Sequence, residues 1–184
     1  TLLRPSSGRA WVAGFDVATQ QTRVRQSIGI IFQDPSLDDR LTARENLRFH
    51  GIIYKVPGKE LPERIAQSLA WMELEDRADD LVRNFSGGMK RRLEIARGLL
   101  HSPRVLFLDE PTIGLDPQTR NRIWEYLLKL RHEFNITLFM TTHYMDEAEY
   151  CDRIAIMDRG KSVVLDSPQN LKDSLGGDVV SLEM

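Results

Sequence analysis

The chain has very few of the residues that build disulfide frameworks or zinc sites. Cys151 is the only cysteine among 184 residues, and the four histidines are scattered along the sequence. A single cysteine excludes an internal disulfide, and a Cys/His zinc site needs several ligands at short spacings. We therefore expect a protein of a reducing, cytoplasmic compartment without structural zinc.

Long apolar runs are also missing. No stretch approaches the roughly 18–20 apolar residues that span a bilayer, and the first residues do not resemble a signal peptide. Neither sign of charge is in large excess, because 25 lysines and arginines face 27 acidic residues for a net charge of −2. This balance gives no general basic surface, so we expect no nucleic-acid partner. The local basic run Lys90–Arg92 is interpreted as a solvated helix face.

The two ends of the sequence suggest a fragment. The chain starts at Thr1 without a methionine, and Val179–Leu182, close to its end, resembles the start of another strand. We therefore expect that the chain is shortened at both ends. Its length still allows one domain with a substantial core, or one domain with a small appendage.

Strands alternate with helices along most of the chain, which predicts a mainly parallel α/β sheet covered on both faces. Continuous apolar runs predict strands, and residues that cap helices predict where helices begin. Strands are expected at 10–14, 28–32, 105–108 and 136–140, with a hairpin of 153–157 and 162–165. Helices are expected at 24–27, from Thr42 to about 54, from Pro62, after Ser86, from Pro117 to about 134, at 145–150 and at 168–175.

Polar side chains follow three of these strands at the point where each strand ends. Gln33 follows the strand 28–32, Asp109 and Glu110 follow 105–108, and His143 follows 136–140. Ligands of open α/β sheets bind outside the carboxyl ends of the strands. Each of these residues alone is also typical of an ordinary loop.

Ser86, Gly87 and Gly88 begin a helix. Unpaired N–H groups, the positive end of the helix dipole and the absence of Cβ atoms let an anion approach such a helix start closely. The same three residues alone would equally suit an ordinary N-cap.

Along the chain these four signals follow one another in the order Gln33, the Ser-Gly-Gly segment, the Asp-Glu pair and His143. Together they resemble the ATP-binding subunits of ABC transporters over essentially the whole chain. The matching motifs are the Q-loop at 31–33, the signature at 85–89, Walker B with its adjacent glutamate at 106–110, the D-loop at 114–116 and the switch histidine His143. Phe85 and Met89 depart from the usual Leu and Gln of the signature. The amino-acid sequences of residues 86–97, 114–120 and 142–145, with Ile123 and Trp124, further resemble the daunorubicin-resistance-type (ABC-2) exporter branch.

The resemblance implies a P-loop NTPase-like (RecA-like) fold with a helical ABC-specific subdomain. Residues 1–33 and 101–175 would form the α/β core, 34–100 the helical subdomain, and 176–184 the start of a C-terminal extension. The P-loop pattern Gly-x-x-x-x-Gly-Lys-Ser/Thr occurs nowhere in the 184 residues, so the P-loop strand and helix would be missing. We expect these residues alone to be poorly stable and neither to bind ATP tightly nor to hydrolyse it.

The resemblance also implies roles for the individual residues. ATP and Mg²⁺ would be the ligands, with Asp109 and Gln33 toward the metal, Glu110 as general base and His143 toward the γ-phosphate. Ser86, Gly87 and Gly88 would serve ATP held by a second protomer in a head-to-tail dimer, and Asp116 would act across that interface.

At the level of the whole protein, the family pattern implies a subunit at the cytoplasmic face of the cell membrane, attached to an integral membrane permease. It would energise export of a drug-like or natural-product-like compound. Two alternatives remain open at this point: a non-transport ABC ATPase, and a non-catalytic interaction module without a P-loop.

Overall fold

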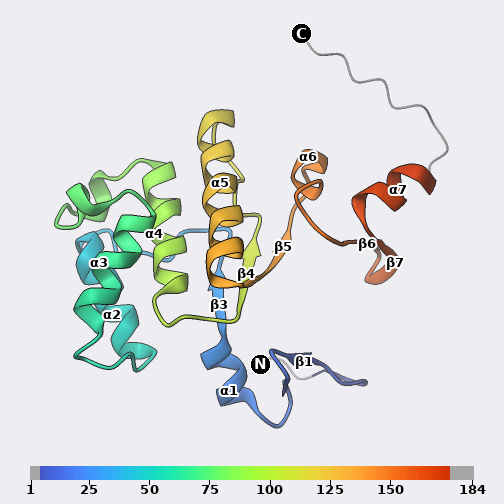
Figure 1. Cartoon of the computed structure of the whole chain (residues 1–184), viewed down its shortest axis with the longest axis horizontal. Helices are drawn as coiled ribbons and strands as arrows, with labels where there is room; N and C mark the ends of the chain where they lie inside the picture. Colours follow the sequence, from blue (N-terminus) through green and yellow to red (C-terminus); the bar gives the residue numbers. More distant parts are fainter. Residues whose placement is uncertain (1–4, 175–184) are drawn as a thin grey trace. The chain divides into compact units, whose positions relative to one another are not determined.

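The structure is a computed structural model that describes residues 5–174. The chain forms two compact units, Thr1–Thr141 and Thr142–Met184, and each is described by itself (Figure 1). The predicted core and helical subdomain have boundaries that differ from those of the two units, and that division stays a prediction. The predicted extension 176–184, and with it the strand start predicted from residues 179–182, lies outside the described residues.

The first unit is built on a three-stranded parallel sheet. Its strands are β3 (Ile28–Ile31), β4 (Val105–Asp109) and β5 (Thr137–Thr141), in the order β3-β4-β5. All three run in the same direction, so their carboxyl ends lie at one edge of the sheet. The predicted parallel sheet is confirmed, and β4 is its central strand.

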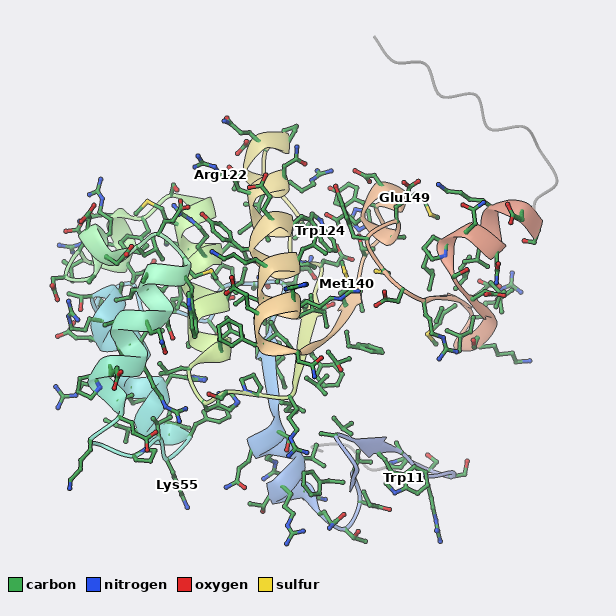
Figure 2. All side chains as sticks on the ribbon, viewed as in Figure 1. Trp11, Lys55, Arg122, Trp124, Met140 and Glu149 are labelled. Carbon is green, nitrogen blue, oxygen red and sulfur yellow. The ribbon has the colours of Figure 1, made fainter. Side chains whose placement is uncertain are left out.

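One face of this sheet carries the core. Leu106 and Leu108 of β4 are at most 2% exposed and share a cluster with buried residues of α4 (Gly87–Leu99) and α5 (Pro117–Phe134). Trp124 of α5 and Met140 of β5, both labelled in Figure 2, belong to the same packing. Gly29 and Gly98 allow α4 to approach β3, because a Cβ atom at Gly29 would lie 2.5 Å from the Gly98 carbonyl oxygen.

The opposite face of the sheet is open. The Phe107 and Phe139 rings contact each other in a tilted arrangement with centroids 5.2 Å apart, yet Phe139 is 59% exposed and Ile30 is 38% exposed. Phe32, predicted to end the buried strand, lies beyond β3 and is 52% exposed. The prediction that both faces are covered is therefore wrong for residues 5–174, because the helices of that region bury only the Leu106 face.

Short elements precede the sheet. The predicted strand at 10–14 is reduced to β1 (Trp11–Val12), which pairs with β2 (Phe15–Asp16) in an antiparallel ladder that the sequence did not predict. The predicted helix at 24–27 begins earlier, as α1 (Gln21–Ser27), and leads directly into β3.

Residues 34–100 form helices between β3 and β4. They comprise α2 (Ala43–Ile53), α3 (Leu61–Trp71), α4 and two 3₁₀ turns at Glu75–Arg77 and Val82–Asn84. The capping box predicted for α2 is confirmed, since the Thr42 hydroxyl accepts a hydrogen bond from the Glu45 N–H at 3.2 Å while the Glu45 carboxylate accepts one from the Thr42 N–H at 2.8 Å. The predicted apolar face of α3 is also confirmed, because its members are at most 7% exposed: Leu61, Ile65, Leu69 and Met72.

Three stacked rings join α2 to the end of α4 and the start of β3. The Tyr54 ring lies 4.4 Å from the His50 ring and 4.1 Å from the His101 ring, measured between centroids. The His101 Nε2 lies 2.8 Å from the Ile28 carbonyl oxygen, which fits an Nε2–H donor on a neutral imidazole. Burial lowers the pKa of His50 to about 3, with smaller contributions from Arg97 and His101, and burial also lowers the pKa of His101.

This stack predicts a loss of stability in mild acid. Unfolded His50 takes up a proton near pH 6.5 and folded His50 only near pH 3, so the contribution of His50 to stability is fully present well above pH 6.5 and is lost progressively below it. Between pH 6.5 and 5 the loss should be about 2 kcal/mol. Urea unfolding of the full-length protein should show a shallower pH dependence for His50→Phe than for wild type. Exposed His132 provides the control, since His132→Gln should keep the wild-type slope; equal slopes for wild type and His50→Phe would contradict the prediction.

The second unit contains α6 (Met145–Ala148), β6 (Ile154–Asp158), β7 (Lys161–Asp166) and α7 (Pro168–Ser174). The predicted hairpin is confirmed, because β6 and β7 pair antiparallel. Arg159 and Gly160, the two residues between them, have φ values of 45° and 75°, as a type I′ turn requires. Within residues 5–174, no helix combines the length and apolar character needed to cross a bilayer.

Candidate active site

The acidic strand end is organised by Thr141, the last residue of β5. Asp109 ends β4 directly beside Thr141 in the register of the sheet. The Thr141 hydroxyl donates a 2.6 Å hydrogen bond to Asp109 Oδ1, and the Glu110 N–H lies 3.1 Å from the same hydroxyl oxygen and 3.2 Å from the Thr141 carbonyl oxygen. Sequence reasoning missed Thr141. The sequence feature that could have indicated Thr141 is its position at the end of the predicted strand 136–140, the next strand along the chain after that of Asp109.

Glu110 leaves the strand in an unusual backbone conformation. Its φ is 43°, in the left-handed region that residues with a Cβ rarely adopt, and its side chain is half-buried. Successive side chains of a continuing strand would point to opposite faces. The turn at Glu110 removes that constraint, which is the condition under which Asp109 and Glu110 can act on one ligand. Strained backbone of this kind is concentrated at functional sites.

Gln33 and the Asp109–Glu110 turn are connected through Arg91 of α4. The Arg91 guanidinium donates hydrogen bonds to the carbonyl oxygens of Phe32, at 2.6 Å, and of Glu110, at 3.2 Å. Gln33 directly follows Phe32 and is exposed. The structure thus places two of the predicted site segments on either side of one buried side chain.

The buried position of Arg91 corrects the interpretation of the basic run. Arg91 is 5% exposed. Arg92 donates a 2.8 Å hydrogen bond to the Met72 carbonyl oxygen, and Lys90 pairs with Asp39 at 3.0 Å. The run is therefore not a solvated helix face, because its central arginine donates hydrogen bonds to backbone carbonyl groups inside the fold.

The Ser-Gly-Gly segment begins α4 as predicted. The Ser86 hydroxyl caps the helix by accepting a 3.2 Å hydrogen bond from the Met89 N–H. Gly87 is exposed, and a Cβ atom there would meet nothing within 4 Å. A Cβ atom on Gly88 would lie 2.7 Å from Cγ2 of Thr119 in α5. Gly87 therefore leaves the helix start accessible, while Gly88 lets the starts of α4 and α5 approach each other.

Asp116 caps α5, also as predicted. Its carboxylate accepts a 3.0 Å hydrogen bond from the Thr119 N–H, and hydrogen bonds from Thr119 lower the pKa of Asp116. Because Thr119 lies against Gly88, the structure brings Asp116 and the Ser86–Gly88 segment into one neighbourhood.

His143 belongs to the second unit and is exposed there. Its ring lies 4.3 Å from the Tyr144 ring, and the neighbouring Thr142 hydroxyl donates a 2.6 Å hydrogen bond to Glu147. Its predicted role toward the γ-phosphate stays a prediction.

The fold and the strand ends define an α/β protein with an acidic site at the carboxyl edge of a parallel sheet. The family model described as ABC transporter matches residues 1–113. The chain belongs to the ABC transporter family, which confirms the resemblance seen in its motifs.

Two curated relatives align along nearly the whole chain. The linearmycin resistance ATP-binding protein of Bacillus subtilis is 41% identical over 180 residues, which are 97% of this chain and 58% of that protein. The daunorubicin/doxorubicin resistance ATP-binding protein of Streptomyces peucetius is 40% identical over 185 aligned positions, covering 100% of this chain and 56% of that protein. The chain thus spans less than two thirds of the length of these relatives.

Two solved structures share the fold. The cbiO1 protein of Clostridium perfringens, part of the ABC transporter complex cbiONQ, superposes with a TM-score of 0.85 at 32% identity and covers 95% of this chain and 71% of that one. An ATP-binding cassette solved as a dimer in a post-hydrolysis state with ADP and Pi gives a TM-score of 0.78 at 29% identity, covering 91% and 76%. Both likenesses confirm the predicted P-loop NTPase-like fold class.

Proposed function

We propose that the complete protein containing this chain is the ATP-hydrolysing subunit of an ABC exporter for a drug-like or natural-product-like compound. The observation that carries the proposal is the turn at the end of β4, where Thr141 holds Asp109 and Glu110 leaves the strand with a φ of 43°. The resistance ATP-binding proteins that align with the chain support the export assignment.

The residues at the strand ends suit a magnesium nucleotide. Among residues 5–174 no three acidic, histidine or cysteine side chains form a metal-binding group. Mg²⁺ in nucleotide sites needs less, since it keeps several waters and takes one or two carboxylates together with substrate phosphates. The exposed Asp109 carboxylate and the Gln33 amide fit that requirement and would hold the ion. When bound, Mg²⁺ would neutralise charge on the phosphates.

The protein side chains would do the rest. Glu110 would accept a proton from the attacking water, and His143 would donate a hydrogen bond to the γ-phosphate. Ser86, Gly87 and Gly88 would offer the start of α4 to ATP held by a second protomer in a head-to-tail dimer, and Asp116 would act across the same interface. The ATPase dimer would be attached to an integral membrane permease at the cytoplasmic face of the cell membrane.

The proposal is tested by phosphate release from the full-length protein together with its membrane subunit. We expect release that saturates with ATP and stops when EDTA removes Mg²⁺, since the phosphates then lose their counter-charge. Saturable hydrolysis that persists in EDTA would contradict the metal assignment. Absence of hydrolysis in the complete complex would contradict the ATPase assignment.

A further inference from the structure

The side chain of Arg91 gathers three consecutive carbonyl groups of the candidate site. Its Nε donates to the Pro111 carbonyl oxygen, and its Nη2 lies 3.3 Å from the Asp109 carbonyl oxygen and 3.2 Å from that of Glu110. Its Nη1 lies 2.6 Å from the Phe32 carbonyl oxygen, next to Gln33. One planar guanidinium therefore binds the turn after β4 and the segment after β3 at once.

Arg91 is itself held by a buried ionic network on α4. Glu94, three residues on, is 0% exposed, with Oε2 3.5 Å from Arg91 and Oε1 3.0 Å from Arg97. Glu94 also accepts a 2.7 Å hydrogen bond from the Ser36 N–H, and Arg97 donates a 2.7 Å hydrogen bond to the Ser36 carbonyl oxygen. The network thus fixes the segment after β3 at two points, Phe32 and Ser36. Burial lowers the pKa of Arg91, and the negative charges of Glu94 and Asp109 oppose this effect. The guanidinium remains charged.

From this geometry we infer that Arg91 is a positioning residue for the proposed ATPase site: it fixes the backbone of Glu110 and of the Gln33 segment relative to α4, whose first residues are Gly87 and Gly88. The inference rests on the proposed function for its catalytic consequence. It assigns Arg91 no contact with substrate.

The fork of the guanidinium explains why arginine is required. Lysine carries a single nitrogen and cannot reach carbonyl groups on both segments with a rigid geometry. Methionine fills a similar volume but removes the guanidinium hydrogen bonds to these carbonyl groups. Without Arg91, the turn would no longer be fixed against α4, and the Glu110 side chain would lose the position that the left-handed turn gives it. A displacement of about 1 Å can cost about 100-fold in rate.

The test compares Arg91→Met and Arg91→Lys with Arg92→Met in the full-length protein. Arg92 is the matched control, because it is the next residue of the same helix and binds carbonyl oxygens of Met72 and Glu73, away from the strand ends. We expect Arg91→Met to lower kcat about 100-fold with the KM for ATP within about threefold, and Arg91→Lys to recover part of that loss. Arg92→Met should keep kcat within about threefold even where its melting temperature decreases.

Amide hydrogen exchange supplies a readout that does not depend on activity. Peptides covering 32–36 and 109–113 should exchange faster in Arg91→Met than in wild type and Arg92→Met. The inference is overturned if Arg91→Met folds with wild-type kcat and exchange, or if kcat decreases equally in both methionine variants. Should Arg91→Met not fold, wild-type kcat and exchange in Arg91→Lys would overturn it. A wild-type protein without ATPase activity would count against the proposed function, and the exchange comparison would still decide the positioning claim.

Discussion

Replacing Glu110 with glutamine in the full-length protein is expected to lower the ATPase kcat by about 1000-fold. Glutamine keeps the volume of the side chain and can still hydrogen-bond a water molecule, but it cannot take up the proton. The turn should persist, because Arg91 and Thr141 hold it through backbone groups of residue 110. ATP binding and ATP-dependent dimerisation should therefore remain intact.

The measurement is phosphate release under saturating ATP, with light scattering to follow the dimer. Glu125→Gln provides the matched control, because it makes the same chemical change at an exposed position of α5. This substitution should leave kcat unchanged. A near-normal rate for Glu110→Gln would show that another group accepts the proton.

The second large effect is expected at Gly87, where activity and stability should change in opposite directions. Gly87 is the first residue of α4, and a Cβ atom there would meet nothing within 4 Å. In Gly87→Asp the new carboxylate lies at the positive end of the helix dipole and should stabilise the protein by about 0.3–1 kcal/mol. The same charge would repel the phosphates of the partner's ATP, so kcat/KM should decrease at least about 100-fold.

Gly87→Asn isolates the charge, because asparagine has the same shape without it. The ratio of kcat/KM between the two variants measures repulsion, and urea unfolding measures the gain in stability. Wild-type kcat/KM in Gly87→Asp would mean that no phosphate approaches the start of α4.

Local sequence patterns predicted most of the elements. Residues a few positions apart decide these elements. Examples are the capping box starting at Thr42, the apolar spacing of α3, Asp116 as the cap of α5 and the turn that contains Gly160. The position of Asp109 at the carboxyl edge was predicted from the continuous apolar run 105–108 and from the succession of strands and helices along the chain. The roles of these side chains toward ATP came from the resemblance to the family and stay predictions.

Features that depend on distant segments could not be predicted. Lys90–Arg92 looks the same in sequence whether it faces water or carbonyl oxygens, and only the meeting of α4 with two strand ends decides that Arg91 is buried. Thr141 became relevant through the register of β5 against β4. Phe139 reads as a core residue, yet it is exposed because no helix within residues 5–174 buries its face of the sheet.

The central claim, that each ATP is hydrolysed between Glu110 of one protomer and Gly87 of its partner, is tested most directly by mixing two inactive variants. In a dimer of Glu110→Gln with Gly87→Asp, one site would carry both substitutions and the other would carry neither. Mixed at equal amounts, the variants should regain about a quarter of wild-type ATPase activity, because half of the dimers are mixed and one of their two sites is intact. If Glu110 and Gly87 instead served the same ATP within one protomer, every site would carry one substitution. The mixture would then stay as inactive as the separate variants.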